Sequence, residues 1–157
     1  MGSLRSRAMK AFIFAAIAGV CWGVGEVFTK SVLHSKQIGP MTALAVRMAI
    51  ATPLIVLAAL IALYRVRSEP TNWLQADRAV LLKLIFGSGL IAGAVALIAF
   101  YVAISLGEVS RIKPVAFAVA PATAVLIGWL VLNEPMTTKK AIGVACILAG
   151  VLLLTGK

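Results

Sequence analysis

The chain has 157 residues, of which 62% are apolar and only 13% are charged. This composition supplies too little polar surface to coat a soluble globule, so it predicts an integral membrane protein. A net charge of +10 would suggest nucleic acid in a soluble protein. Here the basic residues are spread over several connections, and topology and contact with anionic membrane lipid explain them better than nucleic-acid binding does.

Five stretches without Asp, Glu, Lys or Arg approach the roughly 20 residues that a helix needs to cross the hydrocarbon core. They predict transmembrane helices at about 11–33, 42–64, 80–106, 112–133 and 138–156. Membrane β-strands would be about ten residues long and would alternate in polarity, which these runs do not. The predicted fold is therefore an all-α integral membrane protein, with residues 1–157 forming a single five-helix domain.

The basic residues also predict an orientation. If the N-terminus is cytoplasmic, nine of them lie on the inner side and five lie at the outer ends. The inner set is Arg5, Arg7, Lys10, Arg65, Arg67, Arg78, Lys83, Lys139 and Lys140, and the outer set is Lys30, Lys36, Arg111, Lys113 and Lys157. Because cytoplasmic ends are enriched in Lys and Arg, we expect the N-terminus inside and the C-terminus outside.

Prolines and hydroxyl residues mark starts and kinks within these helices. Thr137 or Thr138 can cap the last helix, and Pro114 suits the first turn of the fourth. Pro53 and Pro121 fall near the middle of the second and fourth helices, where a proline frees a backbone carbonyl and kinks the helix. Broken helices at this depth are typical of transporter binding sites, although structural helices also contain kinks.

Charged residues also occur inside the first two apolar runs. At about 1.5 Å per residue, Glu26 lies roughly 22 Å from the cytoplasmic boundary, and Arg47, on a helix running the other way, lies at a similar depth. These depths predict that Glu26 and Arg47 pair inside the bundle. Trp22, Glu26 and Lys30 share one helical face, so Lys30 is expected to extend the stripe outward.

An ionised group at this depth costs a few kcal/mol unless it faces a partner or water. Two interpretations of the pair remain open. It can be a static ion pair that fixes the docking of the first two helices, or it can line a substrate path together with Trp22 and Tyr101.

Catalytic and cofactor motifs are not evident. The single histidine, His34, cannot build a His-based triad or a His-rich metal site. Cys21 and Cys146 lack the neighbours that zinc needs and are interpreted as small core residues. Gly89 and Gly93 belong to a glycine-rich run inside a membrane helix, where close helix packing explains them better than a dinucleotide site. No enzyme activity, metal or cofactor is expected.

Residues 110–154, SRIKPVAFAVAPATAVLIGWLVLNEPMTTKKAIGVACILAGVLLL, resemble the closing part of an EamA-like repeat of the drug/metabolite transporter superfamily. The Trp-Gly pair of the first helix and the arginine of the second fit the same pattern. The matching positions are Trp22, Gly23, Arg47, Pro121, Gly128, Trp129, Asn133, Glu134, Gly143 and Gly150. A surface ion pair with Lys139 or Lys140 explains Glu134 better than a transport role does.

The resemblance implies an inner-membrane transporter of small metabolites or toxic compounds. Many members of the family that the chain resembles have ten helices, built from two inverted five-helix repeats, whereas one repeat is evident here. The chain is therefore expected to act as a dimer or half-transporter, with an identical chain or a second membrane protein as its partner and a small-molecule substrate. The alternative is a non-transporting accessory or structural subunit of a larger membrane complex.

Overall fold

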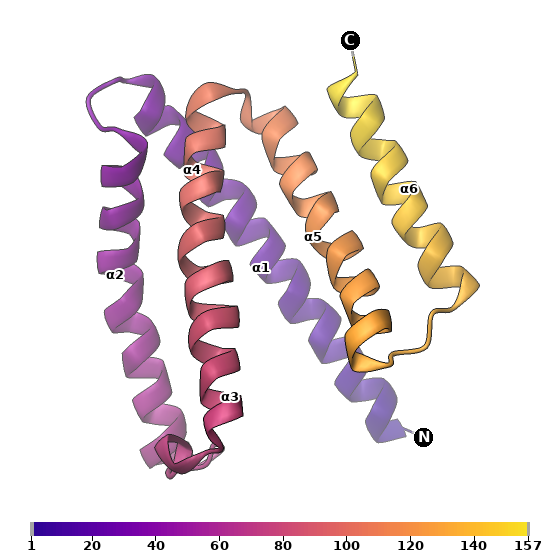
Figure 1. Cartoon of the computed structure of the whole chain (residues 1–157). Coiled ribbons are helices and arrows are strands. Elements are labelled where there is room, and N and C mark those ends of the chain that lie inside the picture. Colours follow the sequence, from indigo (N-terminus) through magenta and orange to yellow (C-terminus); the bar gives the residue numbers. More distant parts are fainter. Residues whose placement is uncertain (1, 157) are drawn as a thin grey trace. The chain divides into compact units, whose positions relative to one another are not determined.

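The computed structural model describes residues 2–156, with side chains from residue 9 onward, and its regular elements are all helices (Figure 1). Five helices in this part of the chain are long and apolar enough to cross a membrane: Met9–His34, Pro40–Val66, Arg78–Leu106, Val109–Leu132 and Thr138–Thr155. The prediction of an all-α membrane protein with five spans is confirmed. The largest shift of a boundary is at the fourth span, which begins at residue 109 rather than 112.

The elements follow one another in the order α1 (Gly2–His34), α2 (Pro40–Leu60), η1 (Ile61–Val66), η2 (Trp73–Gln75), α3 (Arg78–Leu82), η3 (Lys83–Val95), α4 (Ala96–Leu106), α5 (Val109–Leu132) and α6 (Thr138–Thr155). The second span consists of α2 and η1, and the third consists of α3, η3 and α4. The chain divides into two compact units, a first unit of Met1–Ser105 and a second unit of Leu106–Lys157.

In the first unit, α1 and α2 contact each other across a short connection. Gly39 is extended and Pro40 opens α2, where its missing N–H removes a donor that a helix start would leave unpaired. The second span ends after η1 at Arg67, which is left-handed with φ 52°. The N–H groups of Arg67 and Ser68 both donate to the Ala62 carbonyl, which ends the helix before the loop.

The middle of the third span, η3, is a π-helix of 13 residues, which the sequence analysis did not predict. Its wider turn brings the carbonyl of residue i−5 close to residue i. A Cβ built on Gly93 would lie 3.3 Å from the Ser88 oxygen, so glycine suits the turn at this position. Among the described residues, no atom of another helix of the first unit lies within 4 Å of a Cβ built on Gly89 or Gly93, so no contact of this kind supports the predicted packing ridge.

In the second unit, α5 and α6 contact each other and are joined by residues 133–137. Asn133 is left-handed with φ 54°, and the N–H groups of Asn133 and Glu134 both donate to the Gly128 carbonyl. The Thr137 hydroxyl accepts a hydrogen bond of 3.2 Å from the Lys140 N–H. The predicted cap of the last helix is therefore confirmed at Thr137.

The start of α5 corrects one prediction. Glu108 is extended, and its carbonyl accepts the N–H groups of Arg111 and Ile112 at 3.0 and 2.9 Å. The helix therefore begins at residue 109, and Pro114 lies inside it rather than in its first turn. Pro121 lies inside the same helix, as predicted.

Most apolar side chains of the five spans lie on the outside of the protein; Phe12 and Leu153, for example, are 76% and 85% exposed. In a membrane-spanning chain this surface faces hydrocarbon rather than water. Only five described side chains combine burial with an apolar or charged character: Leu44, Tyr101, Ile104, Ala118 and Glu26. Four of these, all except Ala118, lie on α1, α2 and α4, the helices that meet around one charged pair.

Candidate functional site

Glu26 lies on α1 and is only 3% exposed, the one charged residue that is buried among the described side chains. Next to it on the same helix, the Thr29 hydroxyl donates a hydrogen bond of 3.0 Å to the Gly25 carbonyl. A carboxylate in the hydrocarbon region is stable only where a partner or water compensates its charge.

Arg47 on α2 supplies that partner. Its Nη1 atom donates to Glu26 Oε1 at 2.8 Å. The short distance is typical of a charge-assisted hydrogen bond, and it joins the first two helices inside the membrane-spanning region. The pairing expected from the matched depths of the two residues is present.

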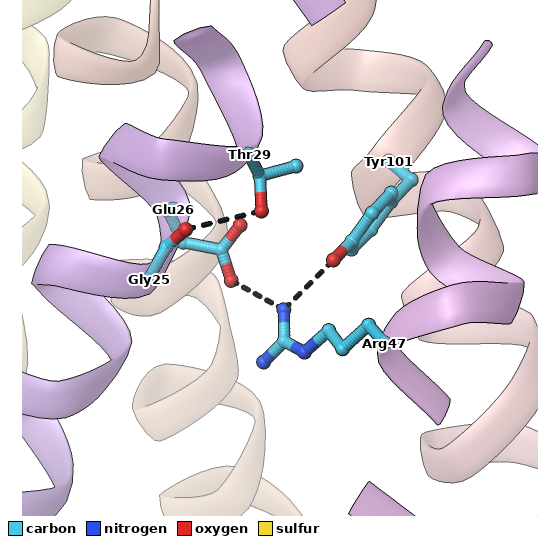
Figure 2. A network of polar contacts seen from close by, with 5 residues as sticks. All are labelled: Gly25, Glu26, Thr29, Arg47 and Tyr101. Atoms are coloured by element: carbon cyan, nitrogen blue, oxygen red, sulfur yellow. Dashed lines mark hydrogen bonds and ion pairs between the residues drawn. The ribbon is translucent and has the colours of Figure 1, made fainter. Parts of the chain in front are cut away.

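Tyr101 on α4 adds a third helix to this cluster (Figure 2). Its hydroxyl accepts a second hydrogen bond from Arg47 Nη1, at 3.1 Å, and the guanidinium lies 5.8 Å from the centre of the Tyr101 ring. Tyr101 is only 1% exposed. The buried tyrosine therefore fixes the arginine both by its hydroxyl and by a cation–π contact.

The second carboxylate oxygen of Glu26 has a different environment. Oε2 is buried, and no group among the described residues forms a hydrogen bond with it. A buried acceptor without a partner is destabilising, and it is stabilised by a proton, a water molecule or a solute. The Glu26 carboxylate thus has one oxygen held by Arg47 and one buried oxygen without a hydrogen bond to a described residue.

A cavity of about 390 Å³ adjoins the cluster on the Arg47 side. Its size falls within the range of roughly 300–1,000 Å³ usual for small-molecule sites. Arg47 and Tyr101 supply its polar groups together with Thr29, and the rest of the wall is apolar. The lining residues are Gly25, Phe28, Thr29, Val32, Ile38, Ala43, Val46, Arg47 and Tyr101.

The model of the EamA-like transporter family matches residues 9–156 of the chain. That match includes all five spans and every residue of the cluster. The chain belongs to the EamA-like transporter family. Comparisons with curated proteins and with solved structures found no match.

The predicted path residues of this EamA-like chain occupy different environments. Glu26, Arg47 and Tyr101 are in direct contact, as described above. Trp22 lies one turn before Glu26 on α1, is 50% exposed, and is not part of the cavity wall. Pro53 lies inside α2, so both predicted mid-helix prolines are within helices of the structure. Neither lines the cavity.

Lys30 lies one turn beyond Glu26 on α1, in the direction of the predicted stripe. Its Nζ donates to the Ile104 carbonyl at 2.9 Å, close to the C-terminal end of α4. Carbonyls in the last turn of a helix lack a partner within the helix, so they accept readily from a cation. Lys30 therefore links α1 to α4, in addition to the link through Arg47.

A second cavity of about 300 Å³ lies at the connection between α1 and α2. Its lining residues are Lys30, Leu33, His34, Lys36, Ile38, Gly39, Pro40 and Ser105. Ile38 borders both cavities. The two cavities are therefore neighbours, and the second has two lysines, Lys30 and Lys36, in its wall.

Some cavity residues were missed in the sequence analysis. Thr29 follows Glu26 by three positions and Phe28 follows it by two, so helical spacing alone could have suggested Thr29. Phe28 could not be found this way, because one apolar residue of a membrane helix resembles another. Groups of His, Cys, Asp and Glu able to hold a metal ion are not found among the described residues. Cys21 and Cys146 are both exposed, so their interpretation as core residues was wrong.

Proposed function

We propose that the chain is a transporter of small metabolites or toxic compounds in the cell inner membrane, acting as a dimer or half-transporter. Two findings support this proposal. The chain belongs to a family of transporters, and a charged cluster of three helices borders a cavity of ligand size. The single most important observation is the cluster itself, because ionisable residues at membrane depth mark solute or proton pathways by default.

The half-satisfied carboxylate suggests how such a transporter couples solute to protons. Oε1 of Glu26 is held by Arg47, whereas Oε2 is available to a proton. Protonation would neutralise Glu26 and loosen the contact with Arg47, which lies on another helix. The Arg47 guanidinium also contacts Tyr101 and borders the cavity. A change in the charge of Glu26 would therefore be transmitted to the solute site by the side chain of Arg47.

A partner chain is part of the proposal. The five spans correspond to one repeat, whereas the two-repeat arrangement encloses its solute between repeats. A second copy of the chain, or another membrane protein, would complete the enclosure. The largely exposed apolar surface of the spans leaves room for such a partner as well as for lipid.

The test is a flux measurement in proteoliposomes made with the full chain. A panel of metabolites and toxic organic compounds is added while an internal pH-sensitive dye follows proton movement. We expect at least one compound to be taken up with protons, and we expect Glu26→Gln to abolish the proton signal while the protein still folds.

Glu134→Gln is the matched control, because Glu134 is an exposed glutamate whose ion pair with Lys140, at 3.5 Å, is superficial. We expect this variant to transport normally. If no compound moves, alone or with membrane neighbours present, and Glu26→Gln only weakens assembly with another chain, the accessory-subunit function replaces the transporter.

A further inference from the structure

We propose that the 390 Å³ cavity binds an anionic group, a carboxylate or phosphate on an apolar body, through the Nε–Nη2 edge of Arg47. This inference rests on the proposed transport function and adds the class of solute to it.

Arg47 has hydrogen-bond donors to spare. A guanidinium has five N–H groups, and both hydrogen bonds that Arg47 makes to described residues leave from Nη1. Figure 2 shows the other nitrogens pointing away from Glu26 and Tyr101. The side chain is 32% exposed and borders the cavity, so these donors are accessible. The Nε–Nη2 edge is a planar fork that matches a carboxylate or phosphate.

The walls of the cavity fit an apolar body attached to the anion. Five apolar side chains line it: Phe28, Val32, Ile38, Ala43 and Val46. An apolar cavity of about 150 Å³ is enough for benzene, so this cavity accommodates a larger ring system or chain. An ion without apolar surface would leave these walls uncovered, whereas an amphiphilic anion covers them and reaches Arg47.

The local charges favour an anion over a cation. Glu26 and Arg47 neutralise each other, and the lining of the neighbouring cavity adds Lys30 and Lys36 but no acidic residue. A cationic solute in the cavity would need Glu26, but Oε1 is held by Arg47 and Glu26 is not among the residues that line the cavity. An anion instead meets accessible donors of Arg47 in a region of positive potential.

The test uses three probes with the same ring and different charge: 2-naphthoate, 2-naphthylmethanol and 2-naphthylmethylamine. Their binding to the full chain in phosphatidylcholine nanodiscs is measured by equilibrium dialysis, with empty nanodiscs subtracted. We expect 2-naphthoate to bind at least tenfold more tightly than the alcohol, and the amine to bind least. Tightest binding by the amine, or equal binding of all three probes, overturns the inference.

Variants separate the arginine edge from charge alone. Arg47→Lys keeps a cation for Glu26 but lacks the fork, so 2-naphthoate should bind at least tenfold more weakly. Glu26→Gln removes the competing carboxylate, so 2-naphthoate should bind more tightly. Arg65→Gln removes a positive charge at the far end of the same span and serves as the control with unchanged binding. Unchanged binding by Arg47→Lys, or amine binding that is lost in Glu26→Gln, overturns the inference.

Lipid headgroups and free solutes share this anionic chemistry, so a second arm adds phosphatidylglycerol to the nanodiscs. Displacement of 2-naphthoate assigns the site to a lipid headgroup, and its absence assigns the site to a soluble anion; both outcomes support recognition of an anion. Binding of a cation with intact flux would overturn the anion inference and leave the transport function standing. Binding of 2-naphthoate without any flux would support the anion inference and overturn the transport function.

Discussion

At the scale of single residues, the two members of the Glu26–Arg47 ion pair differ in how deeply their side chains are buried. The Glu26 side chain is 4% exposed and that of Arg47 is 32% exposed. Removing Arg47 leaves a buried carboxylate without its counter-ion, whereas removing Glu26 leaves a guanidinium that still reaches the cavity and Tyr101. The two single substitutions should therefore differ, although they break the same contact.

We expect Arg47→Met to destabilise the protein by up to about 3–5 kcal/mol, the range for breaking a buried pair, and Glu26→Gln to destabilise it less. The double variant Glu26→Leu/Arg47→Met should be more stable than either single variant, because no charge is then left without a partner. Reversible unfolding of purified protein in mixed micelles measures this order. A double variant less stable than both single variants would contradict the account of the pair.

The pair could be predicted from the sequence because helix rise fixes depth, and two opposite charges at one depth are expected to meet. The orphan Oε2 of Glu26 and the bond from Lys30 to the Ile104 carbonyl could not be. These two features depend on side-chain rotamers and on the distance between α1 and α4. The spacing of residues along one helix predicts neither the rotamers nor that distance.

At the scale of elements, the cap of α6 was predicted from the sequence, whereas the start of α5 and the middle of the third span were not. Thr137 caps α6 as expected, since hydroxyl residues satisfy free N–H groups at helix starts. The π-helix η3 was missed, because an apolar run of membrane length has the same composition whether its hydrogen bonds span four residues or five. Pro114 was misplaced because α5 begins one turn earlier, at an extended Glu108 without a side-chain cap.

The cap gives a prediction at this scale. Thr137→Ala removes the acceptor for the Lys140 N–H and should destabilise the protein by about 1 kcal/mol. Thr138→Ala is the matched control, since Thr138 is the first residue of α6 and makes no such bond among the described residues. Thermal unfolding in detergent, with both variants measured together, tests the difference. Equal melting temperatures would show that the cap does not stabilise α6.

At the scale of the whole molecule, the sequence predicted the number of spans because hydrophobic length is a strong signal. The orientation stays a prediction that rests on the distribution of basic residues. Reporter fusions after Gly39 and after the last residue should both be active outside the cytoplasm. A cytoplasmic signal from either fusion would contradict the N-in, C-out arrangement.

The number of spans also makes the proposed dimer testable. Five crossings place the two ends of the chain on opposite sides of the membrane, so two copies joined directly end to end must have opposite orientations. Two copies joined through one added transmembrane helix must instead have the same orientation. Because the basic residues favour a single orientation, we expect two identical chains to assemble in parallel.

The two fusions therefore distinguish the assemblies. The fusion with the added helix should show the flux of the separate chains in proteoliposomes, whereas the direct fusion should be poorly inserted or inactive. A second measurement places Glu26→Gln in only one half of the active fusion and shows whether the two copies share one pathway. If each copy conducts alone, half of the flux of the unmodified fusion remains. If both copies line one path, more than half of that flux is lost. An active direct fusion and an inactive spaced one would instead establish the inverted pairing of two repeats, and the charge bias would then not determine how the chains meet.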